Sequence, residues 1–253
     1  MSTVSASAPA RVSSSSVAPP EAPLQSLLDD IVADITALYG GTIGIAVAGA
    51  DGVTMAGFDA PSPAWSTIKV PIAIAALRAN PGLYADAQAA LTVSDNDAAA
   101  RLYDAVGPDA VNQVLAEMGA GAQVNTVLTR PGFSTFGQTM LTTGQEAVMA
   151  GRLACVPGAG DVVAFMRQVD ASQAYGLGTT GDAAYKGGWG PDEAGMYTTR
   201  QFGLMPRGDG TVAAVAITAL PADGSYGTGQ GMLNAAALAL QEQAGLLPQA
   251  ACS

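Results

Sequence analysis

The sequence predicts an α/β (α+β) protein. We expect a five-stranded antiparallel sheet, flanked by N- and C-terminal helices, with an all-helical lobe inserted between two groups of strands. Three observations predict this fold: a helical pattern opens the chain, strand-like text occupies 42–58 and returns only after residue 180, and a long alanine-rich stretch lies between. The two groups of strands join in one sheet only if the alanine-rich stretch is an insertion.

The first helix and hairpin are well marked. Apolar residues with i, i+3, i+4, i+7 spacing run from Leu24 to Leu38, and Gly40-Gly41 end the helix. Strand-like segments 42–48 and 53–58 then surround Asp51-Gly52, a typical hairpin turn.

The remaining elements follow from the same patterns. From residue 66 to about 153 the text is helical, with breaks at Asn80-Pro81-Gly82, Gly107-Pro108 and Gly119. The later strands and the closing helix are predicted at 183–189, 197–205, 212–220 and 232–244. We interpret GTGQGM, residues 227–232, as the loop before the last helix, since it lacks the third glycine of a dinucleotide-binding loop.

These elements divide the chain into four parts. Residues 1–23 are rich in Ser, Ala and Pro and predict a flexible tether. An α/β lobe is expected from 24–60 together with 180–248, a helical lobe from 61–179, and a C-terminal tail from 249–253.

Composition excludes several kinds of chemistry. The net charge of −11 disfavours binding to nucleic acid. The chain has no histidine, so a Ser-His-Asp triad, a Cys-His pair and a His-ligated zinc site are impossible. It also lacks G-x-S-x-G and GK[ST] motifs, and we expect no metal or organic cofactor.

The two cysteines and the N-terminus bear on location. Cys155 and Cys252 either form one disulfide that ties down the tail or are two unrelated thiols. The start has neither the basic nor the apolar region of a signal peptide, and no stretch is long enough to span a membrane. A bare methionine before such a tether is typical of a chain trimmed after a leader, so we expect an exported protein.

The stretch AWSTIK, residues 64–69, carries the first chemical motif. Lys69 is one of only two lysines in the chain and follows Ser66 by three residues. If a helix starts at Ser66, the two side chains share a face. A serine nucleophile needs a base, and without histidine a deprotonated lysine is the strong candidate. We expect burial and a second cation, Lys186, to lower the pKa of Lys69.

Two further motifs complete the pattern. Ser94-Asp95-Asn96 places a hydroxyl and an amide at the start of a helix, where each of these residue types is also a good N-cap. The second lysine begins KGGWG, residues 186–190, on a predicted strand. Three motifs in this order, including both lysines, indicate a catalytic site.

S-x-x-K, S-D-N and K-G-G in this order resemble the motif set of the class A β-lactamases and penicillin-binding D,D-peptidases. The resemblance covers about residues 24–246, because the order of elements also fits that fold. It implies that Ser66 is the acylated nucleophile and Lys69 its base. Ser94 would pass a proton to the leaving nitrogen, Asn96 would hold the side-chain amide of the substrate, and Lys186 would supply positive potential.

The resemblance also implies a substrate-binding strand. The backbone N–H groups of Ser66 and Trp189 would form the oxyanion hole, beside Gly187 and Gly188 of the K-G-G motif. Arg200 heads a segment that resembles the family strand whose arginine helps to bind the substrate carboxylate.

The sequence departs from the family in three ways. Gly187 replaces the threonine of K-T-G, which removes a hydroxyl expected to bind the substrate carboxylate. No Asp or Glu lies between Glu117 and Glu146, where class A enzymes carry the glutamate that activates the deacylating water; Gln138 cannot replace it, and we interpret Glu146 as part of a capping box with Thr143. The stretch from Ser66 to Ser94 is short for the family, so we expect a more open cleft.

These patterns predict an exported serine acyl-enzyme. It would react with a β-lactam, a D-Ala-type peptidoglycan peptide or an ester, and deacylate slowly. The alternatives are an efficient β-lactamase with an unidentified water-activating group and a non-catalytic binding domain of the cell envelope.

Overall fold

The computed structural model describes residues 22–251, and its centre is a five-stranded antiparallel sheet, as predicted. The strand order is β2-β1-β7-β6-β5, so β5 forms one edge. The strands are β1 (Thr42–Gly49), β2 (Gly52–Gly57), β5 (Ala184–Pro191), β6 (Tyr197–Pro206) and β7 (Val212–Leu220). Strand β7 pairs with β1, which joins the two groups of strands across the helical insertion.

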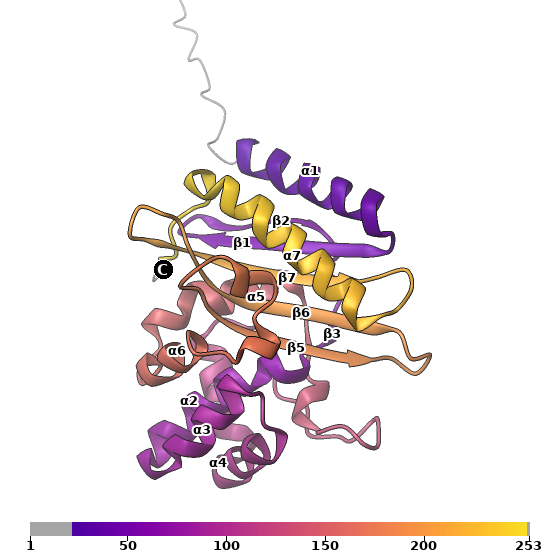
Figure 1. The fold of residues 1–253 in the computed structure, drawn as a ribbon. Helices are drawn as coiled ribbons and strands as arrows, with labels where there is room; N and C mark the ends of the chain where they lie inside the picture. Colours follow the sequence, from indigo (N-terminus) through magenta and orange to yellow (C-terminus); the bar gives the residue numbers. More distant parts are fainter. Residues whose placement is uncertain (1–21, 252–253) are drawn as a thin grey trace, which may run out of the picture.

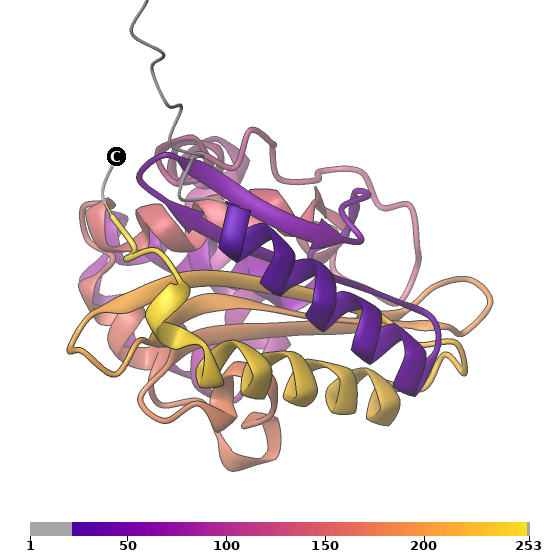
Figure 2. The same ribbon diagram turned by 90° about the horizontal axis from the view of Figure 1, so that it is seen from above.

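Two helices cover one face of the sheet. Helix α1 (Ala22–Tyr39) and helix α7 (Tyr226–Glu242) lie side by side along it (Figures 1 and 2). Their apolar stripes and the facing strand residues form one core, which includes Leu28, Ile35, Ile45, Ile217, Leu233 and Leu240. The predicted tether lies outside the described residues except for its last two positions, which begin α1.

Helix α7 begins six residues earlier than predicted, at Tyr226. The segment 227–232 is therefore its first turns and not a loop. The Ser225 hydroxyl caps the helix by accepting a bond from the Thr228 N–H. The glycines serve close packing: a Cβ at Gly229 would lie 2.5 Å from the Thr199 hydroxyl, and one at Gly231 would lie 3.2 Å from the Tyr39 ring. Glycine has a low intrinsic preference for helices, but here close packing against β6 and α1 outweighs it.

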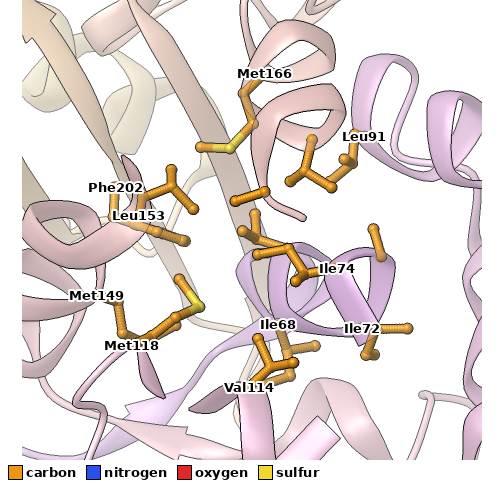
Figure 3. Close-up of a cluster of buried hydrophobic side chains, with 14 of the residues drawn as sticks. Ile68, Ile72, Ile74, Leu91, Val114, Met118, Met149, Leu153, Met166 and Phe202 are labelled. Carbon is orange, nitrogen blue, oxygen red and sulfur yellow. The ribbon is translucent and has the colours of Figure 1, made fainter. Parts of the chain in front are cut away.

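The opposite face carries the second core. Helix α5 (Thr143–Arg152) packs on β1 and β7, where Gly151 lies close to Ala48 and Ala214. Beyond it lie α2 (Lys69–Ala79), α3 (Tyr84–Thr92), α4 (Asn96–Glu117) and α6 (Gly160–Met166). Figure 3 shows the apolar side chains that these helices and β6 bury together, among them Ile74, Leu91, Met166 and Phe202.

The helical expectation for 66–153 is wrong between 120 and 142. That segment is mostly irregular, and short strands β3 (Ser62–Pro63) and β4 (Met140–Leu141) pair across it. The buried Gln138 side chain satisfies the backbone locally, since its amide bonds the main chain of Thr129, Arg130, Phe133 and Ser134. Such side-chain bonds compete with helix formation.

Short 3₁₀ turns connect many of these elements. They are Trp65–Ile68, Pro81–Leu83, Phe136–Gln138, Leu153–Cys155, Ala171–Gln173, Gly176–Thr179 and Ala244–Leu246. Within α4, Gly107 has a φ of 73° and kinks the helix at the predicted Gly107-Pro108 break. The tail is tied to the sheet by a bond from the Ala250 N–H to the Val212 carbonyl, 2.7 Å.

Two absences concern the described part of the chain, and one prediction falls partly outside it. Within residues 22–251, no helix is long and apolar enough to cross a membrane, and no group of His, Cys, Asp and Glu could hold a metal ion. Cys252 lies outside the described residues, so its pairing with Cys155 stays a prediction.

Candidate active site

Ser66 lies in a 3₁₀ turn between β3 and α2, and its side chain is half-buried. We had expected a helix to start at Ser66, but helix α2 begins at Lys69. The preceding residue, Trp65, has a φ of 52°, which is rare for a residue with a side chain. Strained backbone of this kind is found at functional sites more often than elsewhere.

Lys69 projects from the start of α2 into the interior, with 1% of its surface exposed. Its amine bonds the Ser94 carbonyl at 2.6 Å, the Asn96 Oδ1 at 2.7 Å and the Ser94 hydroxyl at 3.2 Å. Burial lowers the pKa of Lys69 to about 8, although the Asp95 carboxylate opposes the shift. A neutral Lys69 amine can donate its two N–H groups to the Ser94 carbonyl and to Asn96 Oδ1. Its lone pair is then left to accept a hydrogen bond from a hydroxyl.

The S-D-N motif occupies the turn between α3 and α4. Asp95 is the N-cap of α4 and accepts from the Ala98 N–H at 2.8 Å, so the capping interpretation of this motif holds for its middle residue. Ser94 has a φ of 59°, and Asn96 is the first helical residue. The cap thus presents the two flanking side chains to Lys69.

Lys186 enters the same network from β5. Its amine bonds the Ser94 hydroxyl at 3.0 Å and the Gly187 carbonyl at 2.9 Å, so that hydroxyl links both lysines. Burial lowers the pKa of Lys186 well below its ordinary value, and the charge of Lys69 lowers it further. We had expected Lys186 to lower the pKa of Lys69. Instead, burial is the cause that lowers the pKa of Lys69, and the charge of Lys69 acts on Lys186.

The glycines of β5 allow the strand to approach the Ser66 turn. A Cβ at Gly188 would lie 2.5 Å from the Ala64 carbonyl and 3.0 Å from the Ser66 nitrogen. At Gly187 a Cβ would lie 3.3 Å from the Tyr175 hydroxyl. The residue after Gly188, Trp189, lines the same pocket as Ser66.

Arg200 does not reach the pocket, contrary to our expectation. It pairs with Gly188 across the β6–β5 ladder and points beneath the Ser66 turn, fully buried. Its guanidinium forms an ion pair with Glu146, at 2.9 Å, and donates to main-chain oxygens around Ser62 and Leu141. With its donors occupied, Arg200 holds the β3–β4 pair and α5 against the sheet.

Glu146 is likewise not part of a capping box. The box at the start of α5 consists of Thr142 and Gln145. Glu146 is fully buried, and its second oxygen accepts from the Thr67 hydroxyl at 2.6 Å, next to Ser66. Burial raises the pKa of Glu146, while Arg200 and these bonds oppose the shift. The buried pair therefore fixes the turn that carries the serine.

A pocket of about 360 Å³ opens above these groups. Its lining includes Ser66, Lys69, Ser94, Asn96 and Trp189, so the structure brings five of the predicted site residues to one cavity. The sequence analysis missed the other lining residues, which are Trp65, Gly132, Phe133, Ser134, Gly137, Gly190, Pro191 and Tyr197. Trp65, inside the AWSTIK stretch, and Gly190, inside KGGWG, could have been suspected from their positions.

Two features of the site limit its chemistry. No acidic residue of the described chain lines the pocket. Within the described part of the chain, the Ser66 hydroxyl has no hydrogen-bond partner, because the Lys69 amine is turned to Ser94 and Asn96. Catalytic hydrogen bonds are often long in structures without substrate and tighten when substrate binds.

The fold and its motif-bearing pocket define a class: the chain has the fold of the class A β-lactamases. No protein-family model matches the sequence, and no curated protein matches it either. The likeness is therefore carried by the structure.

Three solved structures illustrate the match. A β-lactamase from Chitinophaga pinensis has a TM-score of 0.69 at 15% identity, covering 85% of this chain and 98% of its own. One from Sphaerobacter thermophilus has a TM-score of 0.67 at 20% identity, covering 88% and 98%. A class A representative from Bacteroides cellulosilyticus has a TM-score of 0.67 at 14% identity, covering 85% and 99%. Identities this low establish the fold.

Proposed function

We propose that this protein is a serine acyl-enzyme that reacts with a β-lactam, a D-Ala-type peptide or an ester and releases the acyl group slowly. The observation that carries the proposal is the pocket in which a half-exposed serine adjoins a buried lysine with a pKa of about 8. A lysine whose pKa lies this close to physiological pH is partly neutral there, and its neutral form is a competent general base for a hydroxyl.

In the acylation step, the Ser66 oxygen adds to the substrate carbonyl carbon while its proton moves to the Lys69 amine. The N–H groups of Ser66 and Trp189 would stabilise the oxyanion. When the tetrahedral intermediate collapses, the bond to the leaving nitrogen or oxygen breaks. The Ser94 hydroxyl, bonded to both lysines, is placed to hand the leaving group a proton and recover one from Lys69.

Deacylation needs a water molecule to attack the Ser66 ester, and that water needs a base. A carboxylate would serve, but none lines the pocket in the described part of the chain. The Gln138 amide, in the neighbouring loop, is fully engaged with the backbone and carries no basic oxygen. We therefore expect the acyl-enzyme to persist.

The test is labelling followed by turnover. Incubation with a fluorescent penicillin and measurement of intact mass should reveal a stable adduct, and a chromogenic cephalosporin should turn over slowly. Ser66→Ala should abolish the adduct. Ser134→Ala removes another hydroxyl of the same pocket and should keep it.

The other outcomes decide between the alternatives. Rapid turnover without a lasting adduct would indicate an efficient β-lactamase with an unidentified water-activating group. No adduct with any β-lactam or activated ester would favour the non-catalytic binding domain. Export is supported by the N-terminal composition, and fractionation of cells that express the natural gene would test it.

A further inference from the structure

The pocket is unusually aromatic for this chain. Both tryptophans of the sequence line it, together with Phe133 and Tyr197. The Trp65 and Phe133 rings pack with centroids 5.2 Å apart, and Trp189 stacks on Tyr226 at 5.3 Å. Trp65, Phe133 and Trp189 each pack against another ring, and this aromatic lining favours a flat apolar ligand group.

The same pocket offers no free cation. Lys69 is the one basic residue among the described residues that line it, and its amine is engaged with Ser94 and Asn96. The Arg130 guanidinium does not line the pocket: it lies 4.7 Å from the Phe133 ring centroid and donates to the Pro191 carbonyl. Lys186 and Arg200 are buried and bonded elsewhere.

The polar groups that remain are neutral. Asn96 accepts from Lys69 through Oδ1, which leaves its NH₂ for a ligand carbonyl. Gly187 contributes no hydroxyl. The nearby Tyr175 is 93% buried, and its hydroxyl accepts a hydrogen bond from the Tyr226 hydroxyl. A carboxylate entering here would lose water without finding an unbonded cationic donor in the lining, in a protein whose net charge is already −11.

We propose that the pocket selects an uncharged ester or amide whose acyl group carries an aromatic ring, and that it discriminates against a carboxylate near the reacting carbonyl. This inference rests on the proposed acylation of Ser66. It departs from recognition of penicillin-like acids, for which Lys186 and Arg200 were the expected cationic partners.

The experiment compares three p-nitrophenyl esters: butyrate, the hemisuccinate of equal acyl length with a terminal carboxylate, and phenylacetate. Acylation rates are taken as the Ser66-dependent release of p-nitrophenolate, that is, the rate with wild type minus the rate with Ser66→Ala at the same ester concentration. We expect butyrate to exceed hemisuccinate by about tenfold or more, and phenylacetate to exceed butyrate. Equal or faster reaction of the hemisuccinate, with the Ser66 adduct present, would overturn the inference and leave the proposed function standing.

Two variants sharpen the result. Phe133→Leu should lower the ratio of phenylacetate to butyrate, whereas Phe136→Leu should not, because that ring contacts Tyr103 and does not line the pocket. Ser134→Arg adds a cation at an exposed lining position and should raise the relative rate of the hemisuccinate, most strongly at low salt. Unchanged ratios in Phe133→Leu would contradict the aromatic part of the inference. If the wild-type protein showed no Ser66-dependent reaction with any of the three esters, the proposed function itself would be overturned.

Discussion

At the scale of single residues, the chemistry depends on how two lysines share one buried region. Both amines contact the Ser94 hydroxyl, and both are almost fully removed from water. Two adjacent buried charges are unfavourable, so one lysine must release its proton at lower pH than the other. Burial lowers the pKa of both lysines, and that of Lys69 falls to about 8, a pH where a base is useful.

The pKa of Lys69 predicts the pH dependence of acylation. The reactive form of Lys69 is neutral, and its pKa is about 8, so the rate should rise about tenfold per pH unit below 8 and level off above it. Adduct formation can be followed by intact mass between pH 5.5 and 9.5. A rate independent of pH below 8 would show that Lys69 is not the base.

A matched variant tests the local electrostatics. The Asp95 carboxylate raises the pKa of Lys69, and Asp95→Asn removes that charge while keeping a good N-cap for α4. The midpoint of the pH profile should therefore move to lower pH in the variant. A midpoint that stays or moves upward would contradict the assignment.

At the scale of elements, glycines decide how closely segments approach the sheet. Gly188 lets β5 meet the Ser66 turn, and Gly229 lets α7 meet β6. In both places a side chain would clash with neighbouring atoms at 2.5 Å. The positions of the catalytic turn and of the covering helix thus both depend on the absence of a methyl group.

A pair of glycine substitutions tests this for α7. Gly229→Ala should destabilise the protein by about 1–3 kcal/mol, because the new methyl group would overlap Thr199. Gly227→Ala lies in open space two residues earlier in the same helix and should stabilise it by about 0.4–1 kcal/mol. Chemical denaturation measures both. Adding Thr199→Ala should restore part of the loss, and equal effects of the two single substitutions would contradict the packing argument.

At the scale of the whole molecule, the site is a junction of the sheet edge and the helical insertion. Ser66 and Lys69 come from the Ser66 turn and α2, Ser94 from the turn before α4, and Lys186 from β5. Folding buries these polar groups among apolar side chains. The free energy of unfolding therefore depends on the same lysine that we propose as the base.

The sign of this dependence can be stated. In the unfolded chain Lys69 keeps its proton up to about pH 10.5, whereas in the folded protein it loses it near 8, so between these values stability rises with pH. Relative to Lys69→Met, the wild-type free energy of unfolding should increase by about 2 kcal/mol from pH 7 to 9.5. Urea denaturation of both proteins across that range measures it. Parallel curves would show that Lys69 is not buried as described.

Local patterns determined much of this protein. The amphipathic spacing of α1, the hairpin at Asp51 and the three late strands were all predicted, because each depends on neighbours in the sequence. The three motifs likewise identified Ser66, Lys69, Ser94 and Asn96, since few residue types can do this chemistry without histidine. Arg200 and Glu146 were misassigned, because nothing local reveals that two residues so far apart form a buried ion pair.

The sequence alone therefore determined the order of elements and the chemical identity of the reacting groups. Only the tertiary structure decided that burial lowers the pKa of Lys69 to about 8, that Arg200 is structural, and that Trp65 and Phe133 both line the pocket. The physical reason is that burial and proximity set pKa values and contacts. Both arise when segments distant in the chain pack together, and neither is encoded in the spacing of residues along it.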